Sequence, residues 1–179
     1  MTSSLNFILL EPNLHDIYIA IGTKAYNQHY RHLWPNGNTA TYIENSFTKE
    51  VLANEELDLN TELYLLEKDG DYIGLLKLVI NKSIGDFNDT DALYLDKIYI
   101  LQEYTGIGIG KVSLNFIEER AKRFSKKVIF LASMQNGPAL PFYLANKFTI
   151  IDTTEVPFKN VIEKEKPMYI LLKEVSFTK

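Results

Sequence analysis

Hydrophobic residues near the start of the chain follow a helical period. Asn13 precedes this run and is a candidate N-cap. A short strand is expected before it, over residues 6–10, and two short helices are expected after it, around residues 40–47 and 48–57. The apolar positions that share one face of the first helix are Leu14, Ile17, Tyr18, Ile21 and Ala25. The first third of the chain is therefore predicted to be mainly helical.

Further along, the pattern changes to short apolar runs, which are typical of strands. Two such runs flank Asp69-Gly70, a dipeptide that tolerates the positive φ angles of a tight hairpin. A third strand is expected over residues 92–101. Residues 127–133 are nearly all apolar, as expected of a strand buried on both faces. The segments "FTIIDTT" and "PMYILLKEV" are predicted to close the chain as strands.

Two helices separate the later strands. The second of them is short, and Pro138 and Pro141 fit only in its first turn, where amide donors have no partner to lose. The first carries one apolar stripe, formed by Leu114, Ile117, Ala121 and Phe124. The order of elements predicts an α/β fold in a single domain, residues 1–179, with a central mixed sheet of about six to seven strands flanked by helices.

Composition narrows the class of protein. The 179 residues, 46% hydrophobic and 23% charged, match one globular domain with a substantial core. No run approaches the roughly 20 apolar residues of a membrane span, and the start of the chain lacks the pattern of a signal peptide. The absence of cysteine excludes disulfides and thiolate metal sites. The net charge of −4 disfavours a nucleic-acid-binding protein that works by neutralising many phosphates. We therefore expect a cytoplasmic protein that binds neither nucleic acid nor membranes.

A glycine-rich segment, "TGIGIGKV", lies just before a predicted helix. It is not a P-loop, because Thr105 and Val112 occupy positions that require Gly and Ser/Thr. It is not a Rossmann fingerprint, because Lys111 or Ser113 falls at the third glycine position. Two interpretations remain: a flexible loop, or a strand–loop–helix unit whose free first-turn amides bind a diphosphate. In the second, the glycines allow phosphates to approach the backbone.

Three segments resemble the GNAT superfamily of N-acyltransferases. The stretch "LDKIYILQEYTGIGIGKVSLNFI" resembles its acetyl-CoA-binding segment, and residues 30–78 are similar to a bacterial branch that includes spermidine/spermine-type acetyltransferases. The stretch "LASMQNGPALPFYLANKFTII" is similar to the second cofactor segment. The residues of that stretch that match the family pattern are Asn136, Ala139, Phe142, Tyr143 and Phe148. The resemblance covers nearly the whole chain and implies a GNAT-like fold.

The sequence departs from the family pattern at several places. Thr105 stands where Gln or Arg is usual, which is expected to weaken diphosphate binding rather than abolish it. Pro141 and Lys147 replace a common basic residue and a common glycine. Tyr94 stands where the polyamine-type branch usually carries Glu, so the nature of the acceptor is open.

The resemblance implies transfer of an acetyl group from the co-substrate acetyl-CoA to a primary amine, by direct attack in a ternary complex. A polyamine-like small molecule is the favoured acceptor. The alternatives are an acyl-CoA sensor without turnover and a protein N-acetyltransferase. A homodimer could form through edge strands in the C-terminal "PMYILLKEV".

Residue roles follow from the same resemblance. A backbone amide on the strand ending at Leu101, with that of Ile100 preferred, would stabilise the thioester oxygen. The amides of residues 106–111 would bind the diphosphate. The full set of expected cofactor contacts is Ile98, Tyr99, Ile100, Thr105, Gly106, Ile107, Gly108, Ile109, Gly110, Lys111, Asn136 and Tyr143.

Proton transfer needs an acid and a base. Tyr143 is the candidate acid, because a phenol with a pKa of ~10 can protonate a thiolate whose thiol has a pKa of ~8.5. The alternative is that Tyr143 is a core aromatic residue beside Phe142. Asp96 is the candidate base, acting through water; each carboxylate considered is otherwise a solvated surface group. The alternatives to Asp96 are Glu55, Glu56 and Glu103.

An asparagine, two histidines and a tryptophan are further candidates for the site. Asn136 could bind the pantetheine amides, cap the following helix, or do both. His29 and His32 lack a third ligand, so they are interpreted as solvated helix residues and no metal is expected. Trp34 is either a wall of the acceptor cleft or part of a small helical core.

Overall fold

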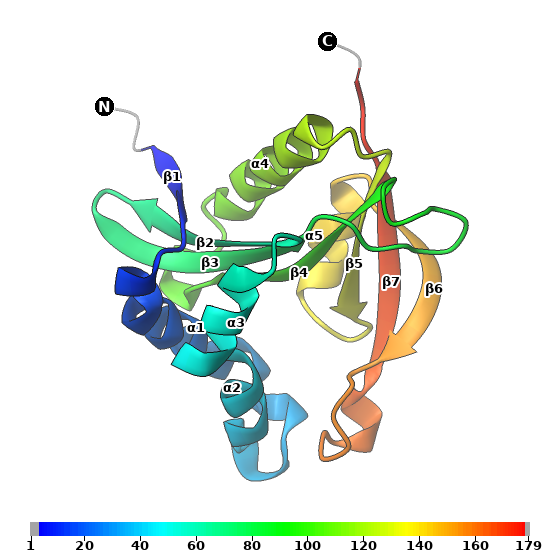
Figure 1. Ribbon diagram of the computed structural model, residues 1–179. Helices are drawn as coiled ribbons and strands as arrows, with labels where there is room; N and C mark the ends of the chain where they lie inside the picture. Colours follow the sequence, from blue (N-terminus) through cyan, green and yellow to red (C-terminus); the bar gives the residue numbers. More distant parts are fainter. Residues whose placement is uncertain (1–3, 178–179) are drawn as a thin grey trace.

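The computed structural model describes residues 4–177, in which a seven-stranded mixed sheet has the order β1-β2-β3-β4-β5-β7-β6 (Figure 1). Every neighbouring pair is antiparallel except β4 and β5. The strands are β1 Leu5–Leu9, β2 Thr61–Lys68, β3 Asp71–Val79, β4 Ala92–Ile100, β5 Val128–Met134, β6 Thr149–Glu155 and β7 Pro167–Glu174. The α-helices are α1 His15–Tyr30, α2 Ala40–Ser46, α3 Lys49–Leu57, α4 Ile109–Arg123 and α5 Ala139–Ala145. The predicted α/β fold with a mixed sheet is confirmed.

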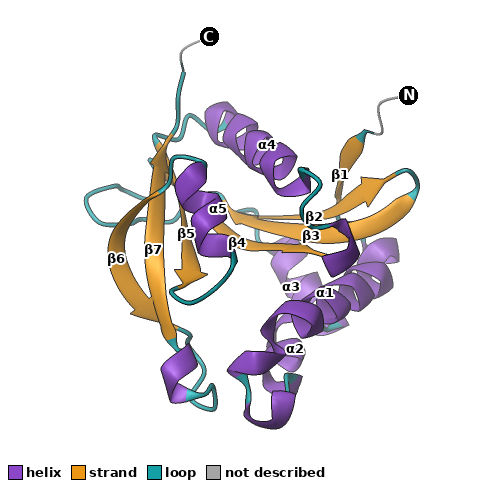
Figure 2. Cartoon of the chain, turned by 180° about the vertical axis from the view of Figure 1, so that it is seen from behind, coloured by secondary structure: helices purple, strands orange, loops and turns teal. Residues whose placement is uncertain are grey.

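Helices cover both faces of the sheet, and each face has its own hydrophobic core (Figures 1 and 2). Helices α1, α2 and α3 pack on one face, around Trp34, Phe47 and Leu52. Helices α4 and α5 pack on the other, where Ile117 of α4 and Tyr143 of α5 belong to the same cluster. This arrangement leaves the sheet as the central layer.

The local signals that depend on glycine and proline are confirmed. Asp69 and Gly70 join β2 to β3 with φ angles of 54° and 90°, as a tight hairpin requires. Pro138 is the N-cap of α5 and Pro141 is its third residue, so neither removes an internal helix hydrogen bond.

Two expectations about helix residues are wrong. Asn13 is not the N-cap of the first helix, because a 3₁₀ turn, Pro12–Leu14, precedes α1 and makes Leu14 the cap position. Phe124 does not complete the buried stripe of α4: it follows the last helical residue, is 38% exposed, and lies against the Arg120 guanidinium group. Each of these residues lies at a helix end, where apolar spacing alone does not fix the boundary.

The C-terminal strand is not an edge of the sheet, contrary to the sequence-based expectation. β7 pairs with β5 on one side and with β6 on the other, so β1 and β6 form the two edges. Every residue of β6 is exposed. Pairing between two copies through β7 is therefore excluded in this fold, since its hydrogen-bonding groups are used within the sheet.

A buried lysine anchors the long connection between β3 and β4. Lys126, 1% exposed, directs its Nζ to three oxygens in that connection. They are Asn81 Oδ1 at 2.5 Å and the carbonyl oxygens of Asp89 at 3.1 Å and Thr90 at 3.0 Å. Burial lowers the pKa of Lys126 from its usual value, against the opposing effect of Asp89 and Asp91. The ammonium group thus donates hydrogen bonds that water would otherwise provide to a loop with little regular structure.

Within residues 4–177, none of the helices has the length and apolar character needed to cross a bilayer.

Candidate active site

The most distinctive feature of the sheet is the separation of β4 from β5. The two parallel strands pair only at their beginnings, where Ala92, Leu93 and Tyr94 lie opposite residues 128–130. Beyond this point β5 stays paired with β7, while β4 stays paired with β3, and the two strands diverge (Figures 1 and 2). The side of β4 that faces this opening, over residues 95–100, has no strand partner in the described part of the chain. We call it the open edge of β4.

Backbone direction determines which amides lie on the open edge. The amide of Leu101 donates to the Ile73 carbonyl on β3, at 2.9 Å. Because successive residues of a strand direct their N–H and C=O groups to opposite sides, those of Ile100 point away from β3, and those of Ile98 do the same. The open edge thus offers the Ile98 and Ile100 amides. Tyr99 instead directs its backbone toward Leu75 on β3.

The carbonyl of Ile100 is occupied by a histidine that sequence reasoning missed. His29, near the end of α1, places its Nε2 atom 2.8 Å from the Ile100 oxygen and is half-buried. The interpretation of His29 as a solvated residue is therefore wrong, while His32 is exposed as expected. A signal was present: His29 continues the spacing of Tyr18, Gly22 and Ala25, which are buried positions of α1.

A second set of free amides lies where the loop from β4 enters α4. Gly108 is the N-cap of this helix, and the first helical hydrogen bond runs from the Val112 amide to the Gly108 carbonyl. The amides of residues 109–111 therefore have no acceptor within the helix. No side chain caps them, and no acidic residue occupies the first turn. Lys111 is exposed in that turn, where a cation is unfavourable beside the positive end of the helix dipole unless an anion binds there.

The three glycines of the loop serve different purposes. Gly106 and Gly108 have φ angles of 76° and 90°, which side-chain-bearing residues rarely adopt, and a Cβ on either would point into open space. Gly110 has an ordinary φ angle, but a Cβ there would lie 3.0 Å from the Phe142 ring. Gly106 and Gly108 thus shape an accessible cradle, whereas Gly110 allows α5 to pack against the start of α4.

That packing brings Tyr143 to the same region. Its ring contacts Phe142 and Phe148 edge-on, and the residue is only 8% exposed. Tyr143 belongs to the hydrophobic cluster against which Ile98 and Ile100 also pack. Burial, and to a smaller extent the nearby phenol of Tyr30, raises the pKa of Tyr143 above that of a free phenol. The hydroxyl is protonated at neutral pH, as any phenol is, and the raised pKa makes it a weaker acid than a free phenol. Core packing and a role in proton transfer are compatible at this position.

Thr105 and Asn136 lie at the borders of this region. The Thr105 hydroxyl donates to the Gln102 carbonyl at 2.8 Å, so it stabilises its own turn. Asn136 is exposed and does not cap α5, whose N-cap is Pro138 without any side-chain hydrogen bond. The capping interpretation of Asn136 is wrong. Ile107 is exposed on the loop, and Ile109 is buried beneath it.

Each of the four candidate carboxylates for the base has a side-chain partner: a lysine for three of them and a histidine for Glu56. Glu55 lies 2.5 Å from Lys77 Nζ, and Asp96 lies 3.1 Å from the same atom and 3.2 Å from Lys97 Nζ. The remaining two carboxylates are also paired: Glu56 lies 2.7 Å from His15, and Glu103 lies 2.5 Å from Lys24. Burial on its own would raise the pKa of Asp96, but Lys97 and Lys77 outweigh it and lower that pKa below the usual value. A lowered pKa makes a carboxylate a weaker base.

An aromatic cluster fills the space between α1, α2 and β4. The Tyr26 and Tyr42 rings stack at 3.7 Å, and the hydroxyls of Tyr42 and Tyr99 lie 2.5 Å apart. Trp34 is 1% exposed and donates its indole N–H to the Tyr26 hydroxyl at 3.0 Å. Phe158, from the β6–β7 connection, packs against Trp34 at 5.7 Å. Trp34 is therefore part of a core, and this core extends to the side chain of Tyr99.

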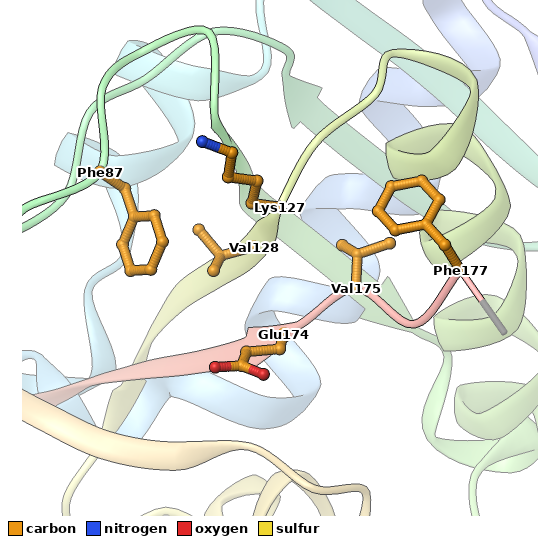
Figure 3. A pocket seen from close by; sticks show the side chains of 6 residues that line it. All are labelled: Phe87, Lys127, Val128, Glu174, Val175 and Phe177. Atoms are coloured by element: carbon orange, nitrogen blue, oxygen red, sulfur yellow. The ribbon is translucent and has the colours of Figure 1, made fainter.

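Surface hollows occur at two places in the described part of the chain. One, of about 320 Å³, lies at the start of β5 and the end of β7, remote from the open edge. Its side chains are shown in Figure 3: Phe87, Lys127, Val128, Glu174, Val175 and Phe177. The other, of about 380 Å³, lies along α1 and is lined by Lys24, Asn27, Gln28 and Arg31. Among the described residues, no three His, Cys, Asp or Glu side chains gather closely enough to hold a metal ion.

Comparison with known proteins places this geometry in context. An uncharacterized N-acetyltransferase of the pepI 3′ region in Lactobacillus delbrueckii subsp. lactis is 28% identical over 111 residues, which span 62% of this chain and 64% of the relative. The PaiA N-acetyltransferase of Thermoplasma acidophilum, solved in complex with coenzyme A, has a TM-score of 0.74 at 20% identity, over 96% of this chain and 99% of that one.

A variant of the spermidine N-acetyltransferase of Vibrio cholerae has a TM-score of 0.69 at 15% identity, over 96% of this chain and 94% of that one. At these identities the structural similarities establish the fold. The family itself is identified by a sequence model, described as the acetyltransferase (GNAT) family, which matches residues 22–148 and therefore more than half of the chain. The predicted superfamily is confirmed: this chain belongs to the acetyltransferase (GNAT) family.

Proposed function

We propose that this protein transfers the acetyl group of acetyl-CoA to a primary amine, by direct attack of the amine on the thioester in a ternary complex. One observation carries the proposal: a single stretch of chain presents two sets of unpaired amides in succession. The first set lies on the open edge of β4, at Ile98 and Ile100, and the second lies at the start of α4, over residues 109–111. A thioester and a diphosphate are the two parts of acetyl-CoA that need such donors.

The residues suit these two parts for different physical reasons. Negative charge develops on the thioester oxygen as the amine attacks, and a backbone amide already directed to that position stabilises it without reorganisation. The diphosphate is anionic in every state, and the helix dipole and exposed Lys111 both favour it. Gly106 and Gly108 leave open space above the backbone. In the chemical step the amine nitrogen bonds to the acetyl carbon, the carbon–sulfur bond breaks and the thiolate leaves, and the proton that the nitrogen loses passes to solvent.

Tyr143 would return a proton to the departing sulfur. A phenol is protonated at neutral pH and so available as a donor. Burial raises the pKa of Tyr143 and makes it a weaker acid than a free phenol, so the transfer requires that the same apolar surroundings also raise the pKa of the thiol. A thiolate that accepts a proton from a phenol becomes a neutral thiol, which avoids the free-energy cost of an unpaired negative charge on sulfur in an apolar site.

The acceptor is proposed to be a small primary amine, with polyamines first in the screen. The similarity to a spermidine N-acetyltransferase supports this order. Lys77 and Lys97 neutralise the negative charge of Glu55 and Asp96, so these carboxylates do not select for a polycation. An amine with fewer positive charges is therefore included in the screen as a second class of acceptor. Peptides with free N-termini or lysines test the alternative of protein N-acetylation.

Calorimetric titration with coenzyme A and a thiol-release assay with acetyl-CoA test the proposal together. We expect heat of binding, and thiol release that depends on at least one amine of the panel. Binding without amine-dependent release would favour an acyl-CoA sensor. An absence of binding heat would contradict the proposal altogether.

Replacing Gly108 by alanine is expected to weaken coenzyme A binding about tenfold. A φ angle of 90° is strained by a Cβ, at a cost of roughly 1–2 kcal/mol, and relief of that strain would turn the first-turn amides away from the diphosphate. Gly70→Ala is the matched control, because Gly70 has the same φ angle and the same open surroundings in a remote hairpin. Equal coenzyme A affinity in the two variants would remove Gly108 from the binding site.

Replacing Asp96 by asparagine is expected to leave the shape of the pH–rate profile unchanged. The pKa of Asp96 is lowered below that of a free carboxyl, so the group is ionised throughout the neutral range and its titration lies at more acidic pH. Its ion pairs with Lys77 and Lys97 give it a structural role instead. Loss of the acidic limb of the profile in Asp96→Asn would restore Asp96 as the base.

A further inference from the structure

His29 makes a hydrogen bond whose direction is fixed by chemistry. Its Nε2 atom lies 2.8 Å from the Ile100 carbonyl oxygen, and a carbonyl oxygen can only accept. Nε2 therefore carries a proton and donates it. This bond joins α1 to the last residue of β4 across 71 positions of sequence.

The hydrogen bond from His29 lies at the end of β4, where β5 no longer pairs with that strand. In a continuous sheet the outward carbonyl of Ile100 would accept from the next strand, but β5 has separated from β4 after Tyr94. His29 satisfies that carbonyl in place of the absent strand. The amide of the same residue, on the same side of the strand, has no hydrogen-bond acceptor within residues 4–177.

Neighbouring side chains of α1 hold the residues that follow. The Gln28 side-chain oxygen accepts from the Gln102 amide at 2.8 Å, and its nitrogen donates to Glu103 at 3.0 Å. Lys24 also binds Glu103, at 2.5 Å. These contacts are exposed, whereas His29 is half-buried at the strand itself. On the side from which β5 has separated, the end of β4 is thus held by α1, while its other side stays paired with β3.

We propose that His29 is a positioning residue for acyl transfer. By holding the Ile100 carbonyl, it keeps the Ile100 amide directed at the thioester oxygen. This inference rests on the proposed function, because the Ile100 amide that His29 would orient is the group proposed to stabilise the negative charge on the thioester oxygen. His29 acts through the backbone of Ile100 and itself exchanges no proton with the substrates.

Two variants separate this role from the alternatives. His29→Ala removes the donor, whereas His29→Gln retains an N–H group that can reach the carbonyl. We expect kcat to fall about tenfold in His29→Ala, a fraction of the roughly 10²–10³-fold loss seen when an oxyanion donor is removed entirely. The KM for acetyl-CoA should change less than threefold, and His29→Gln should recover most of the activity. His32→Ala is the control, since His32 is exposed close by in the sequence.

A second measurement does not depend on turnover. In the amide NMR spectrum, adding acetyl-CoA to the parent protein should shift the Ile100 signal, and His29→Gln should behave in the same way. In His29→Ala this shift should be reduced, while the amide of Gly108 responds as in the parent. Thermal unfolding of each variant establishes that the comparison is made between folded proteins.

Several results would overturn the inference. The Ile100 amide could respond equally in His29→Ala and the parent, or His29→Gln could be as impaired as His29→Ala. Loss of the acidic limb of the pH–rate profile in both variants would instead assign His29 as the base. A parent protein that binds coenzyme A and acetylates an amine, but tolerates His29→Ala, contradicts this inference alone. A parent that shows no heat with coenzyme A contradicts the proposed function.

Discussion

Replacing Tyr143 by phenylalanine is expected to lower kcat about 10²-fold while leaving the affinity for acetyl-CoA nearly unchanged. The substitution removes one oxygen and keeps the ring that packs against Phe142 and Phe148. The hydroxyl is the only part of the side chain able to donate a proton, and a phenol carries that proton at neutral pH. Without it, the thiolate must leave unprotonated or take a proton from water.

Steady-state kinetics with acetyl-CoA and the best amine of the screen provide the measurement. Tyr169→Phe is the matched control, because Tyr169 packs against the same hydrophobic cluster from β7. A similar loss in both variants would trace the effect to packing. An unchanged turnover number in Tyr143→Phe would exclude this residue from the mechanism.

Replacing Lys126 by methionine is expected to lower the free energy of unfolding by about 3 kcal/mol. Methionine fills a similar volume but cannot donate to Asn81, Asp89 and Thr90, whose oxygens would then lose a charged partner. Hydrogen bonds to charged groups contribute roughly 1.5–3 kcal/mol each, and partial rehydration of the loop offsets part of the loss.

Urea unfolding, followed by circular dichroism, measures this difference. Lys127→Met is the control, because Lys127 is exposed and its ion pair with Asp91, at 3.0 Å, is of the surface kind that contributes about 0–1 kcal/mol. Equal stability of the parent and Lys126→Met would show that the loop does not depend on the buried ammonium group.

Much of the fold could be predicted because its signals are local. The Asp69-Gly70 hairpin, the apolar run of β5 and the placement of Pro141 in the first turn of α5 each depend on a few adjacent residues. The order of elements followed from these, and with it the fold class. The position of β7 could not be predicted, because whether a strand lies inside a sheet or at its edge depends on which strands pair.

The candidate site likewise has one part that local sequence signals indicate and another part that depends on contacts between distant segments. The glycines before α4 mark its free amides, since helix termini leave amides unpaired in any sequence. No side-chain pattern in the sequence indicates the open edge of β4, because Ile98 and Ile100 act through their backbone amides and other residue types could stand at these positions. The ion pairs of Asp96 and the bond from His29 to Ile100 join segments far apart in sequence, so no local pattern encodes them.

The brief pairing of β4 with β5 also affects how the sheet can deform. Three residue pairs join two halves that are otherwise complete, β1 to β4 on one side and β5 to β7 on the other. Bending at this seam changes the angle between the halves without breaking a hydrogen bond inside either one. Small substitutions at this seam are therefore expected to change the width available to an acyl chain while both halves keep their internal hydrogen bonds.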